Sequence, residues 1–488
     1  MLQLRTEEDA PAMPARAART DARGVFGLGD AVVLGLSGSG PAQTLAVSIA
    51  SLTAACQYGG ALAVLLCFVP MLGIALGYQR LNRWDPNAGA TYTWVARTFH
   101  PYLGFLAGWM ILLYYTLGTS SLTIPAGTYT LELLAPGLVD RPLAVAVTGG
   151  AWNILVTLLA LKGLKVAARF EWLIVGFQYA VLLIAAAAGL VALAHGTAAA
   201  HFSWDWFTPA GSGGMRGLTS GILIACFMYS GWDAAIYINE ESADRTHAPG
   251  RAAITSVTIL ALCYLVCVLG FQAALPLPTL QAHAGNALAL VGPALLGKPW
   301  GTLMSLAVLT GTLATLQAAI ISAARVGFAM ARDRVMPPIF LRIDAASGNP
   351  WAATAVMSLV NLVLLALALS ASDIGRALGN VVGSLGLIAV VFYGLTAAAS
   401  LWQARRQLHR SGRDFLLGGL LPGAGAAFMA WVAVEAVRSG ALTAPMLWCG
   451  AGSIAIGALV AVLLHLIGRA PFFTRTASSL SATEGKAP

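Results

Sequence analysis

Two short tracts of small residues could bind a solute through the backbone. The first reads Gly35-Leu-Ser-Gly-Ser-Gly-Pro41, and the second reads Phe227-Met-Tyr-Ser-Gly-Trp-Asp233. Glycine lacks a Cβ and proline lacks an N–H, so each tract should interrupt a helix. A helix that begins after a break offers free N–H groups to an anion, and one that ends before it offers carbonyls to a cation. The pair therefore predicts a site for a solute that carries both charges, such as an amino acid.

Each tract also has a plainer interpretation. The small residues of the first could instead allow close helix packing. Asp233 is the deepest ionisable group of the second, and a charge inside lipid is costly enough to indicate function. We expect Asp233 to titrate in proton coupling or to contact a cationic substrate. The alternative is that its side chain caps the helix that resumes there.

Two threonines on another apolar segment could bind a cation. Thr312 and Thr315 share a helix face because they stand at positions i and i+3. If this face lies against the first tract, the two hydroxyls could help to coordinate sodium, which prefers oxygen ligands. The alternative is that they donate to carbonyls of their own helix.

Charged residues at the end of the second tract's segment form a candidate gate. Glu240 and Glu241 close the segment, and Arg245 and Arg251 follow in the next loop. We expect the carboxylates to pair with basic loops. Because exposed ion pairs are weak, such a gate would need several of them.

Two other carboxyls, Asp30 and Glu171, lie in the first turns of their apolar segments. We expect both to be solvated, or paired with a loop arginine, at the membrane edge. The sequence holds no HExxH motif, no carboxylate–histidine cluster in its apolar segments and no GxxxxGK[ST] motif. These absences predict no metal, no cofactor and no direct use of ATP.

Long apolar helices must position these residues. Of the 488 residues, 58% are hydrophobic and only 10% are charged, with a mean hydropathy of +0.77. Charge this sparse cannot cover a water-facing surface, and the continuous apolar runs are long enough to cross a bilayer as helices. We predict an all-α polytopic membrane protein. Its twelve expected spans are 25–51, 58–79, 102–124, 143–161, 171–194, 217–239, 253–275, 299–324, 352–371, 377–401, 414–434 and 445–467.

The basic residues orient these spans. With the amino terminus inside the cell, 23 of the 28 lysines and arginines are cytoplasmic, as the positive-inside rule requires. The exceptions are Arg141, Arg216, Lys298, Arg376 and Arg438. We therefore expect both termini in the cytoplasm, with 1–24 and 470–488 as disordered tails, and membrane lipid as a partner. The net charge of +8 follows from this rule and indicates no nucleic-acid partner.

The two interrupted spans are the first and the sixth, so they cross in opposite directions. Such a pair is typical of a 5+5 inverted repeat, which places a substrate between half-helices near the middle of the membrane. We divide the chain into a transport core of ten helices at 25–401 and two additional helices at 402–469.

Four segments stand in the order and at the spacing of a known family. They are the tract Gly35–Gly40; Asn87-Ala-Gly-Ala-Thr-Tyr-Thr-Trp94; the stretch from Gly231 through Glu240-Glu241-Ser242 to Arg251; and the stretch from Arg325 to Pro337. On these segments the chain resembles the amino acid–polyamine–organocation (APC) superfamily of permeases. The resemblance implies a leucine-transporter-like fold, an inverted repeat plus two helices, that works by alternating access.

The resemblance also implies a binding site. The substrate carboxylate would rest on the backbone of the first break and the amine on the carbonyls of the sixth. The implied substrate-binding residues are Ser37, Gly38, Ser39, Gly40, Phe227, Tyr229, Ser230 and Gly231. Phe227 takes the place of a gating aromatic, although a phenylalanine in an aromatic-rich span could simply pack.

The sequence departs from the family pattern at two positions. Pro41 follows the first tract where relatives usually place a bulky apolar residue. Several proton-coupled relatives carry a lysine on the fifth helix, and the corresponding position here is Gln178. A neutral amide cannot relay a proton as a lysine can. The coupling ion therefore stays open between a proton and sodium.

Together these features predict a secondary transporter of an amino acid or related amine, driven by protons or run as an exchanger. Alternatives are a polyamine or other organic-cation transporter, a sodium-coupled transporter, and a non-transporting membrane receptor of the same fold. A receptor would usually carry a soluble sensory domain, and the short loops leave no room for one. Tyr114, Tyr115 and Gln317 are candidates for the pocket that would hold the substrate side chain.

Overall fold

The computed structural model describes residues 26–282, 287–344, 348–369, 374–440, 442–467 and 471–474. Within these ranges the chain is almost entirely helical and holds no β-strand. An isolated bridge joins Phe26 to Ser242 and brings the start of the first span and the end of the sixth to one face of the bundle. We call this the amino-terminal face. The tail expected at 1–24 lies outside the described residues.

The spans follow the predicted order. In the described ranges, eleven helical segments are long and apolar enough to cross a membrane. The sixth span is too short for that criterion because it is broken, and with it the count agrees with the predicted twelve. The all-α polytopic fold is thus confirmed. The spans are α1 (Leu28–Ser39) with α2 (Pro41–Cys56), α3 (Gly60–Trp84), α5 (Pro101–Leu134), α6 (Pro142–Leu161), α7 (Leu164–Ala194), α8 (Gly214–Met228) with α9 (Ala234–Tyr237), α10 (Ala248–Ala274), α13 (Thr302–Arg332), α14 (Trp351–Leu369), α15 (Ile374–Ala404), α17 (Leu421–Arg438) and α18 (Ala444–Leu466).

Short helices occupy several connections. They are α4 (Thr91–Thr98), α11 (Leu277–Ala282), α12 (Ala287–Leu296) and α16 (Gly412–Asp414). The sequence predicts only a connection between 275 and 299, where the structure has α11 and α12. α12 packs against α2, α7 and α13, so this apolar segment belongs to the bundle although it is too short to span.

The first span breaks at one residue. Gly40, between α1 and α2, has a φ of 48°, in the left-handed region that glycine adopts at no steric cost. Pro41 takes the first position of α2, where its missing N–H breaks no helical hydrogen bond. The predicted interruption is confirmed and is confined to Gly40, because α1 continues to Ser39.

The sixth span breaks over a longer stretch. α8 ends at Met228, residues 229–233 form turns, and α9 begins at Ala234. Gly231 lies inside the turns with a φ of 98°, which favours glycine. A 3-10 turn at Asn239–Glu241 then ends the span on the amino-terminal face. This predicted interruption is also confirmed.

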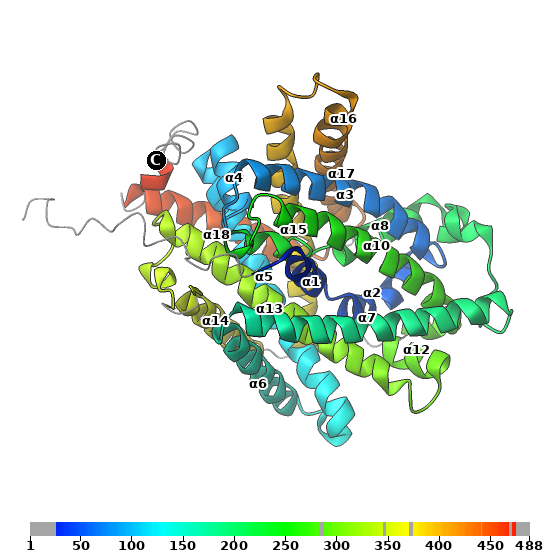
Figure 1. Cartoon of the computed structure of the whole chain (residues 1–488). Helices are drawn as coiled ribbons and strands as arrows, with labels where there is room; N and C mark the ends of the chain where they lie inside the picture. The colour runs from blue at the N-terminus through cyan, green and yellow to red at the C-terminus, as the bar shows by residue number, and fades with distance from the viewer. Residues whose placement is uncertain are drawn as a thin grey trace, which may run out of the picture.

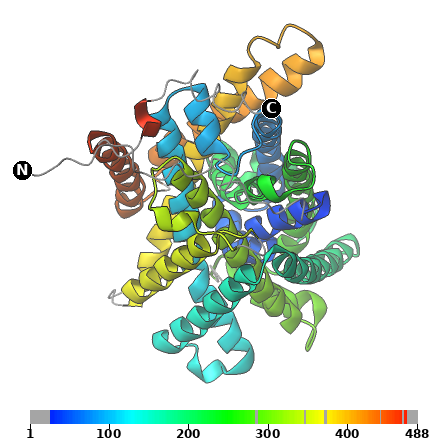
Figure 2. The same cartoon turned by 60° about the vertical axis from the view of Figure 1, so that its left-hand side comes forward.

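The two broken spans lie inside the bundle. Figure 1 shows α1 near the centre, between α10 and α13, and both of these helices contact it. α18 lies at the rim of the bundle (Figure 2), and only 17% of the residues in its most apolar stretch are buried. The additional helices therefore flank a core that surrounds the two breaks.

The segment after α18 differs from the disordered tail expected from 470 onward. Pro471–Thr474 form a short 3-10 helix in which Phe472 and Phe473 are buried. Phe472 stacks on Tyr92 with ring centroids 5.2 Å apart, and Phe473 lies 4.9 Å from the ring of Tyr102. Two aromatic residues beside a polar tail form no periodic pattern, which is why the sequence did not indicate this contact. Residues 475–488 lie outside the described residues.

Candidate functional site

The two breaks meet through their backbones. A Cβ on Gly38 would lie 2.2 Å from the carbonyl oxygen of Gly231, and a Cβ on Gly231 would lie 2.3 Å from the carbonyl oxygen of Gly38. Only glycine permits so close an approach at both positions. Next to this contact, the Ser39 hydroxyl donates to the carbonyl of Gly35 at 3.4 Å. The structure therefore brings the two predicted tracts into direct contact.

Asp233 is fully buried behind the sixth-span break. Its Oδ1 accepts a hydrogen bond from the Tyr393 hydroxyl at 2.6 Å, and its Oδ2 accepts one from the Tyr237 hydroxyl at 2.8 Å. The side chain makes no hydrogen bond to the start of α9, so the capping interpretation is wrong. The Tyr393 hydroxyl also accepts from the N–H of Gly231 at 3.0 Å. One tyrosine thus links the carboxyl to the break.

The start of α2 is where the sequence predicts donors for an anion. Pro41 has no N–H, and the N–H of Ala42 points to Gln178 on α7, whose Oε1 accepts at 3.4 Å. The N–H of Gly40 bonds back to the Leu36 carbonyl at 3.0 Å. The amide nitrogen of Gln178 has no hydrogen-bond partner among the described residues. Gln178 therefore lies at the predicted anion position, with donor capacity to spare.

Thr312 and Thr315 lie on the face of α13 that meets the first break. A Cβ on Gly40 would lie 2.0 Å from the Thr315 hydroxyl oxygen, so these two residues are in close contact. Both hydroxyls donate to their own helix, Thr312 to the Val308 carbonyl at 2.8 Å and Thr315 to the Gly311 carbonyl at 3.0 Å. The Thr312 hydroxyl also lies 3.1 Å from Oε1 of Gln43 on α2. The interpretation as bonds within the helix is confirmed. A role for the hydroxyl oxygens in binding sodium stays a prediction.

Glu171 is not at a solvated membrane edge. Its side chain is buried, and its Oε2 accepts a hydrogen bond from the hydroxyl of Ser37, one turn before the first break. The expectation of solvation is wrong because α1 covers this turn of α7. Asp30 fits the expectation better, since it is partly exposed and accepts from the Trp172 indole at 2.9 Å.

The end of α8 supplies the predicted carbonyl side of the site. The Ser230 hydroxyl donates to the Phe227 carbonyl at 2.6 Å, which occupies one of the acceptors freed by the break. The Tyr229 hydroxyl reaches α3 and donates to the Val64 carbonyl at 3.2 Å. Phe227 itself is partly exposed, and its ring lines a cavity.

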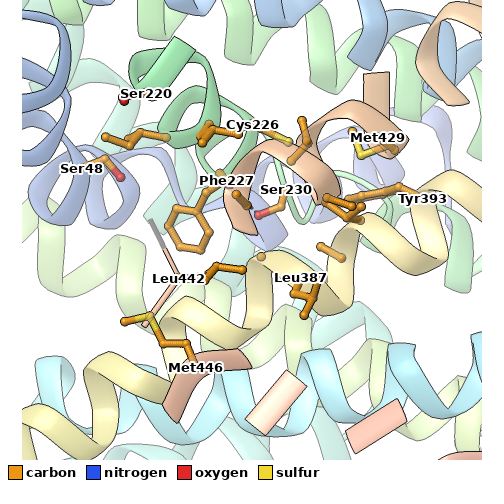
Figure 3. A pocket seen from close by; sticks show the side chains of 18 of the residues that line it. Ser48, Ser220, Cys226, Phe227, Ser230, Leu387, Tyr393, Met429, Leu442 and Met446 are labelled. Carbon is orange, nitrogen blue, oxygen red and sulfur yellow. Dashed lines mark hydrogen bonds between the residues drawn. The ribbon is translucent and has the colours of Figure 1, made fainter. Parts of the chain in front are cut away.

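This cavity, of about 430 Å³, lies beside the sixth-span break. Figure 3 shows Phe227, Ser230 and Tyr393 among the side chains that project into it, together with Leu442 and Met446. Its walls come from α2, α3, α8, α15, α17 and α18. Because α2 and α8 lead from the breaks away from the amino-terminal face, the cavity lies between the breaks and the opposite face. No Asp, Glu, Lys or Arg is among the described residues that line it.

The candidate side-chain pocket residues do not line this cavity. The ring of Tyr114 packs edge-on against Phe392 with centroids 5.4 Å apart. Tyr115 packs in the same way against Tyr237 at 5.7 Å, on the side that holds Asp233. Gln317 is fully buried in α13.

Two ion pairs tie the end of the sixth span to α13 on the amino-terminal face. Arg332 binds Glu240 with Nη2 2.6 Å from Oε1, and the same carboxylate accepts from the N–H of Ala88 at 2.9 Å. Arg325 binds Glu241 through Nε, which lies 3.1 Å from both carboxylate oxygens. These pairs join the end of the sixth span, the loop before α4 and the end of α13. Both ion pairs lie on the amino-terminal face.

The ion pairs of the two glutamates come from α13 rather than from the loop that holds Arg245 and Arg251. Arg251 is exposed at the start of α10, and the Arg245 carbonyl accepts from the Asn82 amide at 2.9 Å. In the same loop Asp244 accepts from the N–H of His247 at 3.0 Å, and this bond holds the pKa of the Asp244 carboxyl below its usual range. A buried carboxylate needs a partner that reaches the interior, and α13 supplies it.

Comparison with known proteins gives a consistent result. A family model described as amino acid permease matches residues 30–468. The low-affinity putrescine importer PlaP of Escherichia coli is 26% identical over 373 residues, which cover 75% of this chain and 79% of the importer. The methylthioribose transporter of Bacillus subtilis is 25% identical over 353 residues, or 69% of this chain and 70% of that protein.

A human relative extends the range of named substrates. The large neutral amino acids transporter small subunit 2 of Homo sapiens is 23% identical over 345 residues, which cover 68% of this chain and 61% of that subunit. All three relatives are transporters rather than enzymes. The family match spans both breaks, the cavity and the ion pairs of the amino-terminal face, and the chain therefore belongs to the amino acid permease family of APC-type membrane transporters.

Proposed function

We propose that this protein is a secondary transporter that carries an amino acid or a related amine across the cytoplasmic membrane by alternating access. The observation that carries the proposal is the direct contact of Gly38 with Gly231 beside a cavity of about 430 Å³. A cavity of this size falls within the range of small-molecule sites, about 300–1,000 Å³. The family match supports transport, and the chemistry of the breaks supports a solute with an ammonium group.

The substrate would bind where the breaks expose backbone groups. Its carboxylate would take donors at the start of α2, including the Ala42 N–H that now bonds Gln178. The donors expected along Ser37–Gly40 are used in this structure, because the Gly40 N–H bonds Leu36 and the hydroxyls of Ser37 and Ser39 have acceptors. Its ammonium would take the carbonyls of the sixth-span break, with Asp233 behind them. Tyr393 lines the cavity and bonds Asp233, so a bound ammonium would act on that carboxyl through one side chain.

The membrane orientation follows from the basic residues. With the amino-terminal face in the cytoplasm, the pairs of Glu240 with Arg332 and Glu241 with Arg325 close the inner side. The cavity then lies on the outer side of the breaks. The structure would therefore represent a state closed to the cytoplasm, and opening inward would require both ion pairs to separate.

Asp233 is the best candidate for proton coupling, because a fully buried carboxyl beside the substrate site can respond to a bound cation. Sodium coupling through Thr312 and Thr315 is the alternative, because a hydroxyl that donates its proton within α13 keeps oxygen lone pairs for a cation. Exchange without a coupling ion also fits. No cofactor is needed for any of these modes.

A polyamine is the second candidate substrate. Asp233 would suit an ammonium without a carboxylate, and the likeness to a putrescine importer points the same way. A diamine also needs an acceptor for its second ammonium, and none of the described residues that line the cavity is charged. The apolar lining therefore favours a substrate with one charged end and an apolar remainder.

The test is ligand binding by the purified full-length protein. Thermal unfolding in detergent is measured with a panel of amino acids, monoamines and putrescine. A ligand at a hundred times its dissociation constant stabilises the folded state by about 2.7 kcal/mol, which is a clear shift in unfolding temperature. We expect stabilisation by at least one neutral amino acid or monoamine. Stabilisation by putrescine alone would favour the second candidate, and no stabilisation by any amine would overturn both.

A further inference from the structure

The bundle holds another buried carboxyl, Glu171, which the proposed transport cycle does not yet use. It lies in α7, and its residue is only 2% exposed. α7 packs directly against α1, and Figure 1 shows it beside the central helices. A carboxyl buried this deeply is normally paired with a cation or fully hydrogen-bonded. Glu171 is neither.

One oxygen of Glu171 is bonded and the other is not. Oε2 accepts from the hydroxyl of Ser37 on α1. Oε1 is buried and has no hydrogen-bond partner among the described residues. An ionised carboxylate with one orphan oxygen in an apolar interior is costly, whereas a neutral carboxylic acid is tolerated. The surroundings therefore fit the protonated form.

Among the side chains that the structure describes, which do not include that of Lys165 on α7, the neighbouring helices supply no cation to Glu171. α7 packs against α1, α2, α6, α10, α12 and α13. Within their bounds, α2, α6 and α12 contain no Asp, Glu, Lys or Arg. The ionisable side chains of the other three helices are engaged or exposed: Asp30 accepts from Trp172, Arg325 binds Glu241, Arg332 binds Glu240, and Arg251 is exposed.

The remaining described titratable groups near this part of the bundle contact other groups or face outward. On α10, Cys263 and Cys267 lie near each other, and the Tyr264 hydroxyl donates to the Met228 carbonyl. On α7, Arg169 is exposed, and Lys162 before the helix is exposed as well. Ser37 is thus the polar group that meets the Glu171 carboxyl in the described part of the chain.

We propose that Glu171 is a proton-binding positioning residue: its neutral form holds α1 against α7, and its ionisation favours opening of the amino-terminal face. This inference rests on the proposed transport function. Opening that face requires α1 to leave α7, which breaks the bond from Ser37 and admits water. The carboxylic acid then gives its proton to water on that face and becomes a carboxylate, which water stabilises. Closure requires the reverse step, uptake of one proton.

The first test is the pH profile of exchange in liposomes, with the pH set separately on the two sides. The rate of exchange by the wild type should depend on the pH at the amino-terminal face, because opening releases a proton there and closure takes one up. Glu171→Gln keeps the shape and an acceptor for Ser37 but cannot ionise, so this dependence should be lost. Asp30→Asn is the matched control, because Asp30 also joins α1 to α7 but is partly exposed, and it should keep the wild-type profile. A Glu171→Gln profile equal to that of the wild type would overturn the inference.

The second test needs no transport and so separates this inference from the proposed function. Infrared spectra of the purified protein are compared between the wild type and Glu171→Gln. The wild type should show a carbonyl stretch of a protonated carboxylic acid that the variant lacks and that Asp30→Asn retains. Ser37→Ala leaves Glu171 in place and should shift the same band. Identical carboxylic acid bands in the wild type and Glu171→Gln would contradict the assignment, even if transport is observed.

Discussion

The hydroxyl of Tyr393 joins the carboxyl and the backbone of the sixth-span break, because it donates to Asp233 Oδ1 at 2.6 Å and accepts from the Gly231 N–H at 3.0 Å. Its ring also stacks on Trp232 with centroids 5.5 Å apart. The same side chain lines the cavity. A solute in the cavity can therefore act on both groups of the break through one residue from α15.

Tyr393→Phe tests this link, because it keeps the ring and removes both hydrogen bonds. Without these bonds Tyr393 no longer positions Asp233 and the Gly231 backbone for the substrate, so the apparent affinity should fall by about tenfold, which corresponds to about 1.4 kcal/mol. Initial rates of uptake at several substrate concentrations give the KM. Tyr264→Phe is the control, since that hydroxyl donates to the Met228 carbonyl at 2.9 Å rather than to Asp233, and its KM should change less. An unchanged KM in Tyr393→Phe would show that the link carries no binding energy.

Gly38→Ala tests the contact between the breaks. The new Cβ would lie 2.2 Å from the Gly231 carbonyl oxygen, and a backbone atom cannot rotate away as a side chain can. Overpacking costs about 1–3 kcal/mol, so we expect a lower unfolding temperature and loss of uptake. In the control, Gly176→Ala, a Cβ meets nothing within 4 Å, and neither property should change. If the two variants had the same unfolding temperature and the same uptake, the close contact of Gly38 with Gly231 would not be needed for stability or transport.

The pair of Glu241 with Arg325 should matter for folding, because the side chains are only 3% and 2% exposed. Arg325→Ala leaves a buried carboxylate unpaired and should destabilise the protein by about 3–5 kcal/mol. Adding Glu241→Gln should recover much of this loss, which thermal unfolding of both variants would reveal. Asp244→Asn, in the exposed pair with His247, should leave stability unchanged. If Arg325→Ala is as stable as the wild type, the pair is not a closing contact.

The carboxy-terminal contact gives a further stability prediction. Phe472→Ala removes a buried ring that stacks on Tyr92. The loss of a phenylalanine ring from a protein core lowers the free energy of unfolding by about 3–5 kcal/mol. We expect a lower unfolding temperature than for Phe415→Ala, whose side chain is 53% exposed. The opposite order would show that the 3-10 helix after α18 adds nothing to stability.

Local residue types explain why the breaks could be predicted from the sequence. Gly40 followed by Pro41 disfavours a continuous helix, and Gly231 sits among residues that form turns once the helix stops. The spans could be predicted for a similar reason, because an apolar run long enough to cross lipid has few other solutions. That the two breaks contact each other could be expected only from the predicted 5+5 inverted repeat.

The partners of the polar residues could not be predicted, because they come from distant parts of the chain. Tyr393 lies 160 residues beyond the Asp233 it binds, and Arg325 lies 84 residues beyond Glu241. A tyrosine inside an apolar span gives no periodic signal of its role. Glu171 was misplaced because distance from the end of a span does not show which helix covers it, and here α1 does.

Exchange of labelled substrate in liposomes tests the central claim most directly. The full-length protein is reconstituted, loaded with an unlabelled amino acid or monoamine from the binding panel, and diluted into the same compound carrying a label. We expect labelled substrate to accumulate inside, and we expect Gly38→Ala to abolish this while Gly176→Ala does not. If no amino acid, monoamine or putrescine is exchanged by a folded wild-type protein, transport at the paired breaks is contradicted.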